Sequence, residues 1–257
     1  MSAPNTIPLT WNGYVQAVCV MAVLQTTTSG GVVSGVDATT NIFLPQAIQY
    51  AELRIQRDLD LLQARVTRPY SLGSNGMALA ISANDFLTVE SMTVSAGGST
   101  TPLLPASQEF IQNVYGDASV TGRPAYFAMT GGDLATVGAT TLGVLIAPAA
   151  DVSYSISAVG MTRMPSLYSF ANAASAATGT TWLSTYLPDM LVVASMVFVS
   201  DYQRNFGANS SDPQMGTSYE QQYGELLAGA KAENARARFE ASAWTAKSQP
   251  AMATPNR

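Results

Sequence analysis

The spacing of apolar residues changes twice along this chain of 257 residues, and the two changes constrain the fold more than any single motif. In residues 44–66 the apolar side chains recur at steps of three and four, which places them on one face of a helix. From about residue 77 to 163 the step becomes two, as in VSYSISAV at 152–159, which is typical of strands with one wet face. The helical period returns after residue 181. The sequence therefore predicts an α+β protein: a mostly helical body, or helix bundle, with a small antiparallel β-rich insertion and an extended C-terminal helix and tail.

The changes of period also predict the domain boundaries. We expect an N-terminal segment with a Gly/Thr loop at 1–40, a helical body at 41–75 and 164–245, a β-rich insertion at 76–163, and a C-terminal tail at 246–257.

Local signals place the ends of the expected helices. Residues 11–24 can form an apolar helix, and the Gly/Thr/Ser stretch at 26–40 is interpreted as a loop. In the helix expected at 44–66, Pro45 suits the first helical position. Arg68–Pro69 ends the run, because a residue before proline disfavours α geometry.

The C-terminal third contains two expected helices. Pro188 suits the start of the first, which is apolar on nearly all sides and so belongs in a core or a subunit contact. Asp212 and Pro213 supply the cap and first-turn proline of the second. After Ala230 this last helix becomes alanine-rich and charged. We therefore expect its end to project from the body.

Composition excludes several classes of chemistry. The chain has no histidine, so it cannot hold a Ser-His-Asp triad or an imidazole metal site. It has no P-loop motif, and Gly30, Gly31 and Gly35 do not form a dinucleotide fingerprint. A glycosidase needs only two carboxylates, but nothing in the sequence pairs the candidates, which are Glu52, Glu90, Glu109, Asp117 and Asp133. We expect no enzyme activity, no metal and no cofactor.

Charge bears on the partners of the protein. Only 11% of the residues are charged and 47% are apolar, with a net charge of −5. Binding to DNA through a basic patch needs clustered cations, which are scarce here, so the sequence does not favour it. A surface with few charges indicates either a large core or extensive cover by neighbouring molecules. The single cysteine, Cys19, lies in an apolar run and indicates no disulfide. No apolar run is long enough to span a membrane.

Three stretches in this order resemble a known family. They are LPQAIQYAELRIQRDL, then GRPAYFAMTGG with YSISAVGMTRMPSL, then TWLSTYLPDMLVVASMVF followed by YEQQYGELLAGAKAENARARF. Together they resemble the head-to-tail adaptor, or head completion, proteins of short-tailed, podovirus-like bacteriophages, over about residues 41–240. The 26–40 loop and the N-terminal segment have no counterpart in that likeness.

The resemblance implies a structural virion protein at the head–tail junction, made in the cytoplasm of a bacterial host. Such adaptors form a ring of about twelve copies with head-to-tail contacts. The ring sits below the portal protein, offers the tail nozzle or hub a platform, and extends a channel through which DNA passes without sequence-specific binding. Neither catalysis nor a cofactor is implied.

Two sets of residues are the candidate contacts. The resemblance places portal contacts in the C-terminal helix and tail, for which the candidates are Arg236, Arg238, Phe239, Trp244 and Lys247. Arg123, Tyr126 and Phe127, in the turn and strand of GRPAYFAM, are candidates for contact with the tail or a neighbouring adaptor. The two aromatic residues could instead fill the core of the β unit. Two other functions stay open: another phage structural protein, such as a tail tube or minor capsid protein, and a carboxylate-dependent cell-wall hydrolase.

Overall fold

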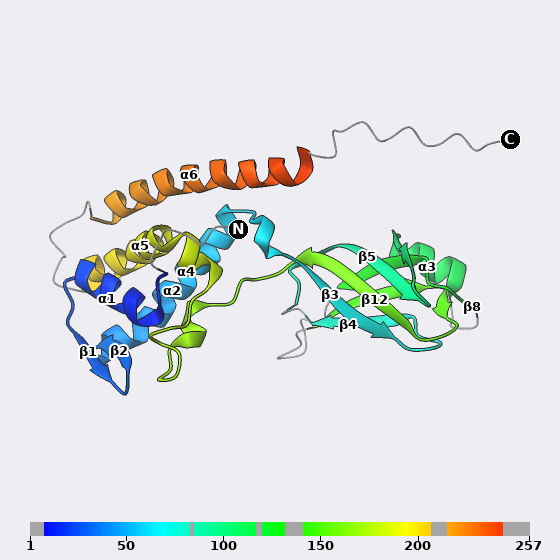
Figure 1. Cartoon of the computed structure of the whole chain (residues 1–257), viewed down its shortest axis with the longest axis horizontal. Coiled ribbons are helices and arrows are strands. Elements are labelled where there is room, and N and C mark those ends of the chain that lie inside the picture. Colours follow the sequence, from blue (N-terminus) through cyan, green and yellow to red (C-terminus); the bar gives the residue numbers. More distant parts are fainter. Residues whose placement is uncertain (1–7, 83–84, 117–119, 132–140, 207–214, 244–257) are drawn as a thin grey trace. The chain divides into compact units, whose positions relative to one another are not determined.

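The structure is a computed structural model that describes residues 8–82, 85–116, 120–131, 141–206 and 215–243 (Figure 1). The chain divides into two compact units. The first contains residues 1–62 and 164–257, and the second contains residues 63–163. The second unit is thus inserted into the first.

The first unit is mainly helical. Its elements in chain order are α1 (Trp11–Met21), the strands β1 (Thr26–Ser29) and β2 (Val32–Gly35), α2 (Ala38–Asp58), the 3₁₀ turn η2 (Leu167–Phe170), α4 (Trp182–Tyr186), α5 (Pro188–Phe206) and α6 (Met215–Ala243). A short 3₁₀ turn, η1 (Leu62–Ala64), lies at the boundary with the second unit.

Helix α5 is the centre of this unit, because α1, α2 and α6 all pack against it. Its side chains are buried around most of its circumference, as the all-round apolar sequence predicts: Met190, Leu191, Ala194, Met196 and Val199 are at most 1% exposed. Helix α5 begins at Pro188, as expected. Asp189 in its first turn complements the positive end of the helix dipole.

Helix α2 is shifted toward the N-terminus from the predicted 44–66. It begins at Ala38, so Pro45 lies inside the helix, and it ends at Asp58. Beyond its end, Leu59 and Leu61 are buried two residues apart, which is the spacing of extended chain. Arg68 and Pro69, expected to stop a helix, lie in a strand instead.

The stretch expected as a loop at 26–40 forms a hairpin and the first residues of α2. Strands β1 and β2 pair antiparallel, with Ser29 opposite Val32. Gly30 and Gly31 make the turn, with φ values of 58° and 82°. Positive φ at both central residues is the geometry of the two-residue turns that favour hairpins, and glycine adopts it without steric cost.

The second unit contains two four-stranded sheets. One has the antiparallel order β3-β12-β5-β6 and the other the order β4-β10-β9-β7, in which β7 runs parallel to β9. The strands are β3 (Arg65–Leu72), β4 (Ala78–Ser82), β5 (Thr88–Ala96), β6 (Ser99–Pro102), β7 (Leu104–Pro105), β9 (Tyr126–Gly131), β10 (Thr141–Ala147) and β12 (Tyr154–Met161). A parallel pair, β8 (Thr121–Gly122) with β11 (Ala149–Ala150), completes the unit.

Both sheets of this unit contribute to one hydrophobic core. Met92 and Ile156 enter it from the first sheet, and Ile81 and Ile146 enter it from the second. Pro69 lies in β3, an edge strand, where a missing N–H costs least. The expected mixture of helix and strand is therefore present, but the prediction of a small β insertion is wrong: the unit is substantial and has its own core.

Local signals in the second unit agree with its structure. Helix α3 (Gln108–Tyr115) follows Ser107, which caps it by accepting from the Phe110 N–H. In β12, Tyr154, Ile156 and Ala158 are buried, as the alternation predicts. Val152, the first apolar residue of the same pattern, precedes the strand and is 52% exposed. The predicted cap at Asp212 and Pro213 lies outside the described residues.

Candidate interaction site

The predicted portal-contact residues lie on and beyond the C-terminal half of α6. Arg236 is exposed, and Phe239 has 70% of its surface exposed. Arg238 instead contacts its own unit. Trp244 and Lys247 lie outside the described residues.

Arg238 is bound to the segment that follows α2. Its guanidinium lies 2.6 Å from the carboxylate of Asp60 and donates to the Asp60 carbonyl oxygen at 2.6 Å. The side-chain amide of Asn234 donates to the same carbonyl, also at 2.6 Å. Asp60 therefore anchors α6 past Ala230, where the sequence offers little apolar surface. The expected projection of this end is wrong at least as far as Arg238.

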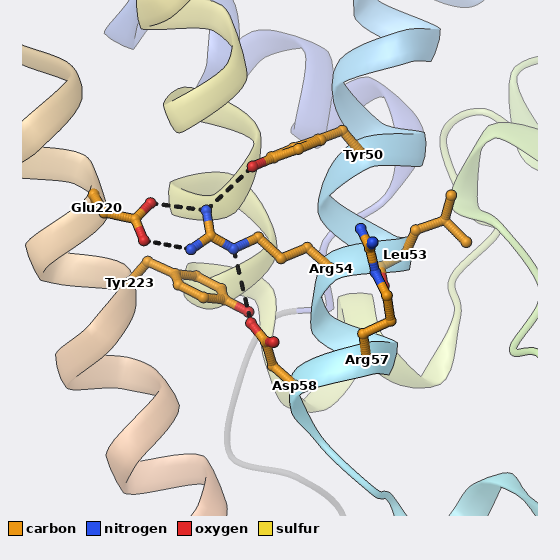
Figure 2. A network of polar contacts seen from close by, with 7 residues as sticks. All are labelled: Tyr50, Leu53, Arg54, Arg57, Asp58, Glu220 and Tyr223. Carbon is orange, nitrogen blue, oxygen red and sulfur yellow. Dashed lines mark hydrogen bonds and ion pairs between the residues drawn. The ribbon is translucent and has the colours of Figure 1, made fainter.

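The N-terminal half of α6 is held by a network centred on Arg54 of α2 (Figure 2). The Arg54 guanidinium forms a two-pronged ion pair with Glu220, with one N–O distance of 2.8 Å. It also donates to the Tyr50 hydroxyl and lies 4.1 Å from the ring centroid of Tyr223. The Tyr223 hydroxyl donates to Asp58 at 2.7 Å. Arginine suits this position because its planar fork both pairs with a carboxylate and stacks on a ring.

The network shifts the pKa values of its members in opposite directions. Hydrogen bonds from Arg54 lower the pKa of Glu220. Burial and the hydrogen bond to Asp58 raise the pKa of Tyr223. Glu220 is thus held as a carboxylate and Tyr223 as a neutral donor at ordinary pH. The charges are satisfied among themselves, so the network fixes the position of α6 and offers no reactive group.

The candidate residues of the second unit are divided between its core and its surface. Phe127 is only 6% exposed and belongs to the core shared by the two sheets. Tyr126 is half-buried, with its ring between those of Phe110 and Tyr115. Arg123 is exposed and donates to the Ser99 carbonyl at 3.1 Å. Of the three, the structure leaves Arg123 the most accessible.

The carboxylates named from the sequence that the structure describes lie on three separate elements, α2, β5 and α3. Glu90 pairs with Arg65 at 2.7 Å on the surface. Glu52 is only 4% exposed and accepts the Leu167 N–H at 2.8 Å, which secures η2 on α2. Burial raises the pKa of Glu52. Glu109 lies in the first turn of α3, and Asp117 and Asp133 lie outside the described residues.

Two further findings concern metals and membranes. Among the described residues, His, Cys, Asp and Glu side chains nowhere gather in a group of three or more that could hold a metal ion. Within the same residues, every helix is too short or too polar to cross a bilayer.

Sequence reasoning missed the polar side chains that join distant segments. Arg54 and Glu220 are 166 positions apart, and no local signal connects them.

The ion pairs and hydrogen bonds around Arg54 and Asp60 hold α6 on its own unit. A family comparison gives the class of protein: residues 19–248 match the model of the SU10 adaptor protein family, whose members are structural rather than catalytic. The match spans most of the chain, so the protein belongs to this family of phage head–tail adaptors. A search of curated proteins finds no match.

Proposed function

We propose that this protein forms a ring, of about twelve copies as in the adaptors it resembles, that joins the portal to the tail nozzle or hub and extends the DNA channel. The observation that carries the proposal is the adaptor family match over residues 19–248. The low charge of 11% supports it, because a ring subunit hides two faces against its neighbours and further area against other virion proteins.

The distribution of charge supports a portal contact through the C-terminal part of the chain. Residues 231–257 contain five basic and two acidic side chains, a net +3, which leaves −8 for residues 1–230. A basic end on an acidic protein favours attachment to an acidic surface of a different protein. Arg236, exposed and without a polar partner in the described part of the chain, is the strongest candidate for this contact.

The surface of the second unit supplies the proposed contact with the tail or a neighbouring adaptor. Arg123 is the accessible member of the predicted set, while Tyr126 and Phe127 shape the strand beside it. DNA passes through the proposed channel without specific binding, since the acidic body lacks the clustered cations that hold phosphates.

Native mass spectrometry of the protein, with and without the portal of the same phage, tests the proposal. We expect a defined multiple of this chain on each portal ring. Arg236→Glu should weaken attachment, because it reverses an exposed charge on the contact helix. Arg57→Glu is the matched control, since Arg57 is also exposed and lies on α2. A protein that stays monomeric in the presence of the portal would contradict the proposed ring. Equal attachment by Arg236→Glu and Arg57→Glu would contradict the proposed contact through Arg236.

A further inference from the structure

The two edges of the β1–β2 hairpin differ. The outer edge of β2 is covered by side-chain amides from the neighbouring helices. Asn12 of α1 accepts the Val33 N–H at 2.9 Å and donates to the Gly31 carbonyl at 2.9 Å. Asn41 of α2 accepts the Gly35 N–H at 2.9 Å and donates to the Gly35 carbonyl at 3.0 Å. Each asparagine thus takes the place of a peptide group of an adjacent strand and fixes the hairpin to the helices.

The outer edge of β1 is open. Val33 and Gly35 direct their N–H groups away from β1, so their opposite residues, Thr28 and Thr26, also direct their backbone groups outward. All four residues of β1 are exposed. In the described part of the chain, no hydrogen bond reaches the outward groups of Thr26 and Thr28. In Figure 1 the hairpin lies at one end of its unit.

Exposed aliphatic residues surround the base of the hairpin. Val23 precedes β1, and Val36 follows β2 with its N–H bonded to the Gln25 carbonyl. Val20 lies in the last turn of α1 beside them, since its carbonyl accepts the Val23 N–H. Ile42 adjoins Asn41, which binds Gly35. Their exposed fractions are large: Val20 75%, Val23 84%, Val36 54% and Ile42 65%.

Val23 has a conformation that valine rarely adopts. Its φ is +57°, in the left-handed region, which disfavours β-branched side chains. Asparagine or glycine would fit that backbone better, and an exposed valine adds nothing to the core of its own unit. A strained and exposed valine is therefore better explained by a contact outside the subunit.

The segment also lacks the charges that usually protect an edge strand. Natural edge strands carry lysine or other charged residues that prevent pairing with another chain. Residues 1–36 contain no Asp, Glu, Lys or Arg, and Asp37 is the first charged residue of the protein. Copies of an acidic chain repel one another over most of their surface, so this neutral surface is where two copies meet at least electrostatic cost.

We propose that the open edge of β1, with the aliphatic cluster Val20, Val23, Val36 and Ile42, is an interface with a second copy of this chain. An extended segment of the neighbour adds a strand to β1, through the backbone groups of Thr26 and Thr28. The neighbour's apolar side chains cover the four aliphatic residues. The inference deepens the proposed function and rests on it for the presence of neighbouring copies, because it names the surface through which they join.

Sedimentation velocity of the full chain over a concentration series tests the edge. Thr28→Pro removes an outward N–H and leaves the β1–β2 ladder intact, because Thr28 occupies a non-hydrogen-bonded position. Thr28→Ala keeps the N–H and is the control. We expect self-association to weaken about tenfold or more in Thr28→Pro, since a lost hydrogen bond and a steric block at the edge together exceed 1.4 kcal/mol. Thr28→Ala should associate like the unmodified protein.

A second pair of variants tests the aliphatic cluster. Val23→Asn should raise the melting temperature, because asparagine tolerates the left-handed region, and should weaken association. Val152→Asn is the control, since Val152 is also exposed, at 52%, but lies in the other unit. If Val23 served only the fold of its own unit, Val23→Asn would not raise the melting temperature while weakening self-association.

Three results would overturn the inference. The unmodified protein could remain monomeric throughout the series, or Thr28→Pro could associate as strongly as Thr28→Ala. Alternatively, the protein could remain monomeric while only Thr28→Pro fails to attach to phage heads, which would assign the edge to another virion protein. If the unmodified protein self-associates but does not attach to the portal, the proposed portal contact is contradicted and this interface remains supported.

Discussion

Arg54 of α2 and Glu220 of α6 form a two-pronged ion pair across 166 positions of sequence. The pair fixes the start of the last helix, and Asp60 fixes its later part through Arg238. The helix that carries the proposed portal contact is therefore positioned by charges at two places. That arrangement leads to predictions for the anchors, for the pH dependence of stability and for the core.

Arg54→Lys should lower the free energy of unfolding by about 1 kcal/mol, because lysine cannot form the fork or stack on Tyr223. The expected loss of free energy is small because half of the Glu220 side chain is exposed, so solvent screens the ion pair. Urea unfolding measures the change. Arg57→Lys is the control, because Arg57 bonds only the Leu53 carbonyl in Figure 2. Equal losses in the two variants would contradict the assigned role of Arg54.

Asp60→Ala should loosen the C-terminal half of α6 without unfolding the unit. The variant loses the ion pair between the Asp60 carboxylate and Arg238 but keeps the Asp60 carbonyl that accepts from Asn234 and Arg238. The anchors at Arg54 and Tyr223 also remain. Hydrogen exchange should therefore quicken in residues 231–243 and stay slow in residues 217–230. Uniform exchange along α6, or no change at all, would show that Asp60 does not hold this half.

Glu220 should make stability fall in acid. Arg54 lowers the pKa of Glu220 in the folded state, so the unfolded chain binds the proton more readily. The stabilisation is complete above the ordinary glutamate pKa and is lost as the pH falls through the lowered value. Unfolding free energies of the unmodified protein and Glu220→Gln should therefore differ at neutral pH and converge in acid. A constant difference would contradict the shift.

Glu52 should have the opposite effect. Burial raises its pKa in the folded state, so the folded protein binds the proton more readily between the ordinary and the raised value. Stability should fall as the pH rises through that interval. Glu52→Gln should remove this slope and keep an acceptor for the Leu167 N–H. If both proteins show the same pH profile, the buried carboxyl group is not the cause.

Ile55→Asp should be severely destabilising. Ile55 is fully buried, and the variant loses about 1.5–3 kcal/mol of apolar burial and places an unpaired charge in the core. We expect little folded protein at 37 °C by circular dichroism. Ile42→Asp is the matched control on the same helix, since Ile42 is 65% exposed. A folded Ile55→Asp variant would show that the stripe on α2 is not a core face.

The elements that sequence reasoning predicted well are those whose signals are local. Pro188 at the start of α5 is a signal within one turn. The alternation of Tyr154, Ile156 and Ala158 is a signal within one strand. Such signals depend on geometry that the segment itself determines.

The elements it missed depend on distant parts of the chain. The apolar period of α2 continues through Leu59 and Leu62, but the path into the second unit ends the helix at Asp58. The hairpin at 26–35 did have a local signal, the pair Gly30–Gly31 between short polar and β-branched runs. The roles of Asn12 and Arg54 could not be inferred, because each depends on a contact between segments that only the fold brings together.

A cryo-EM reconstruction of the phage particle at the head–tail vertex tests the central claim most directly. The account predicts a ring of this chain between the portal and the tail, with the face of α6 that carries Arg236 toward the portal. Density for this protein elsewhere in the particle, or a vertex in which portal and tail meet without it, would contradict the account.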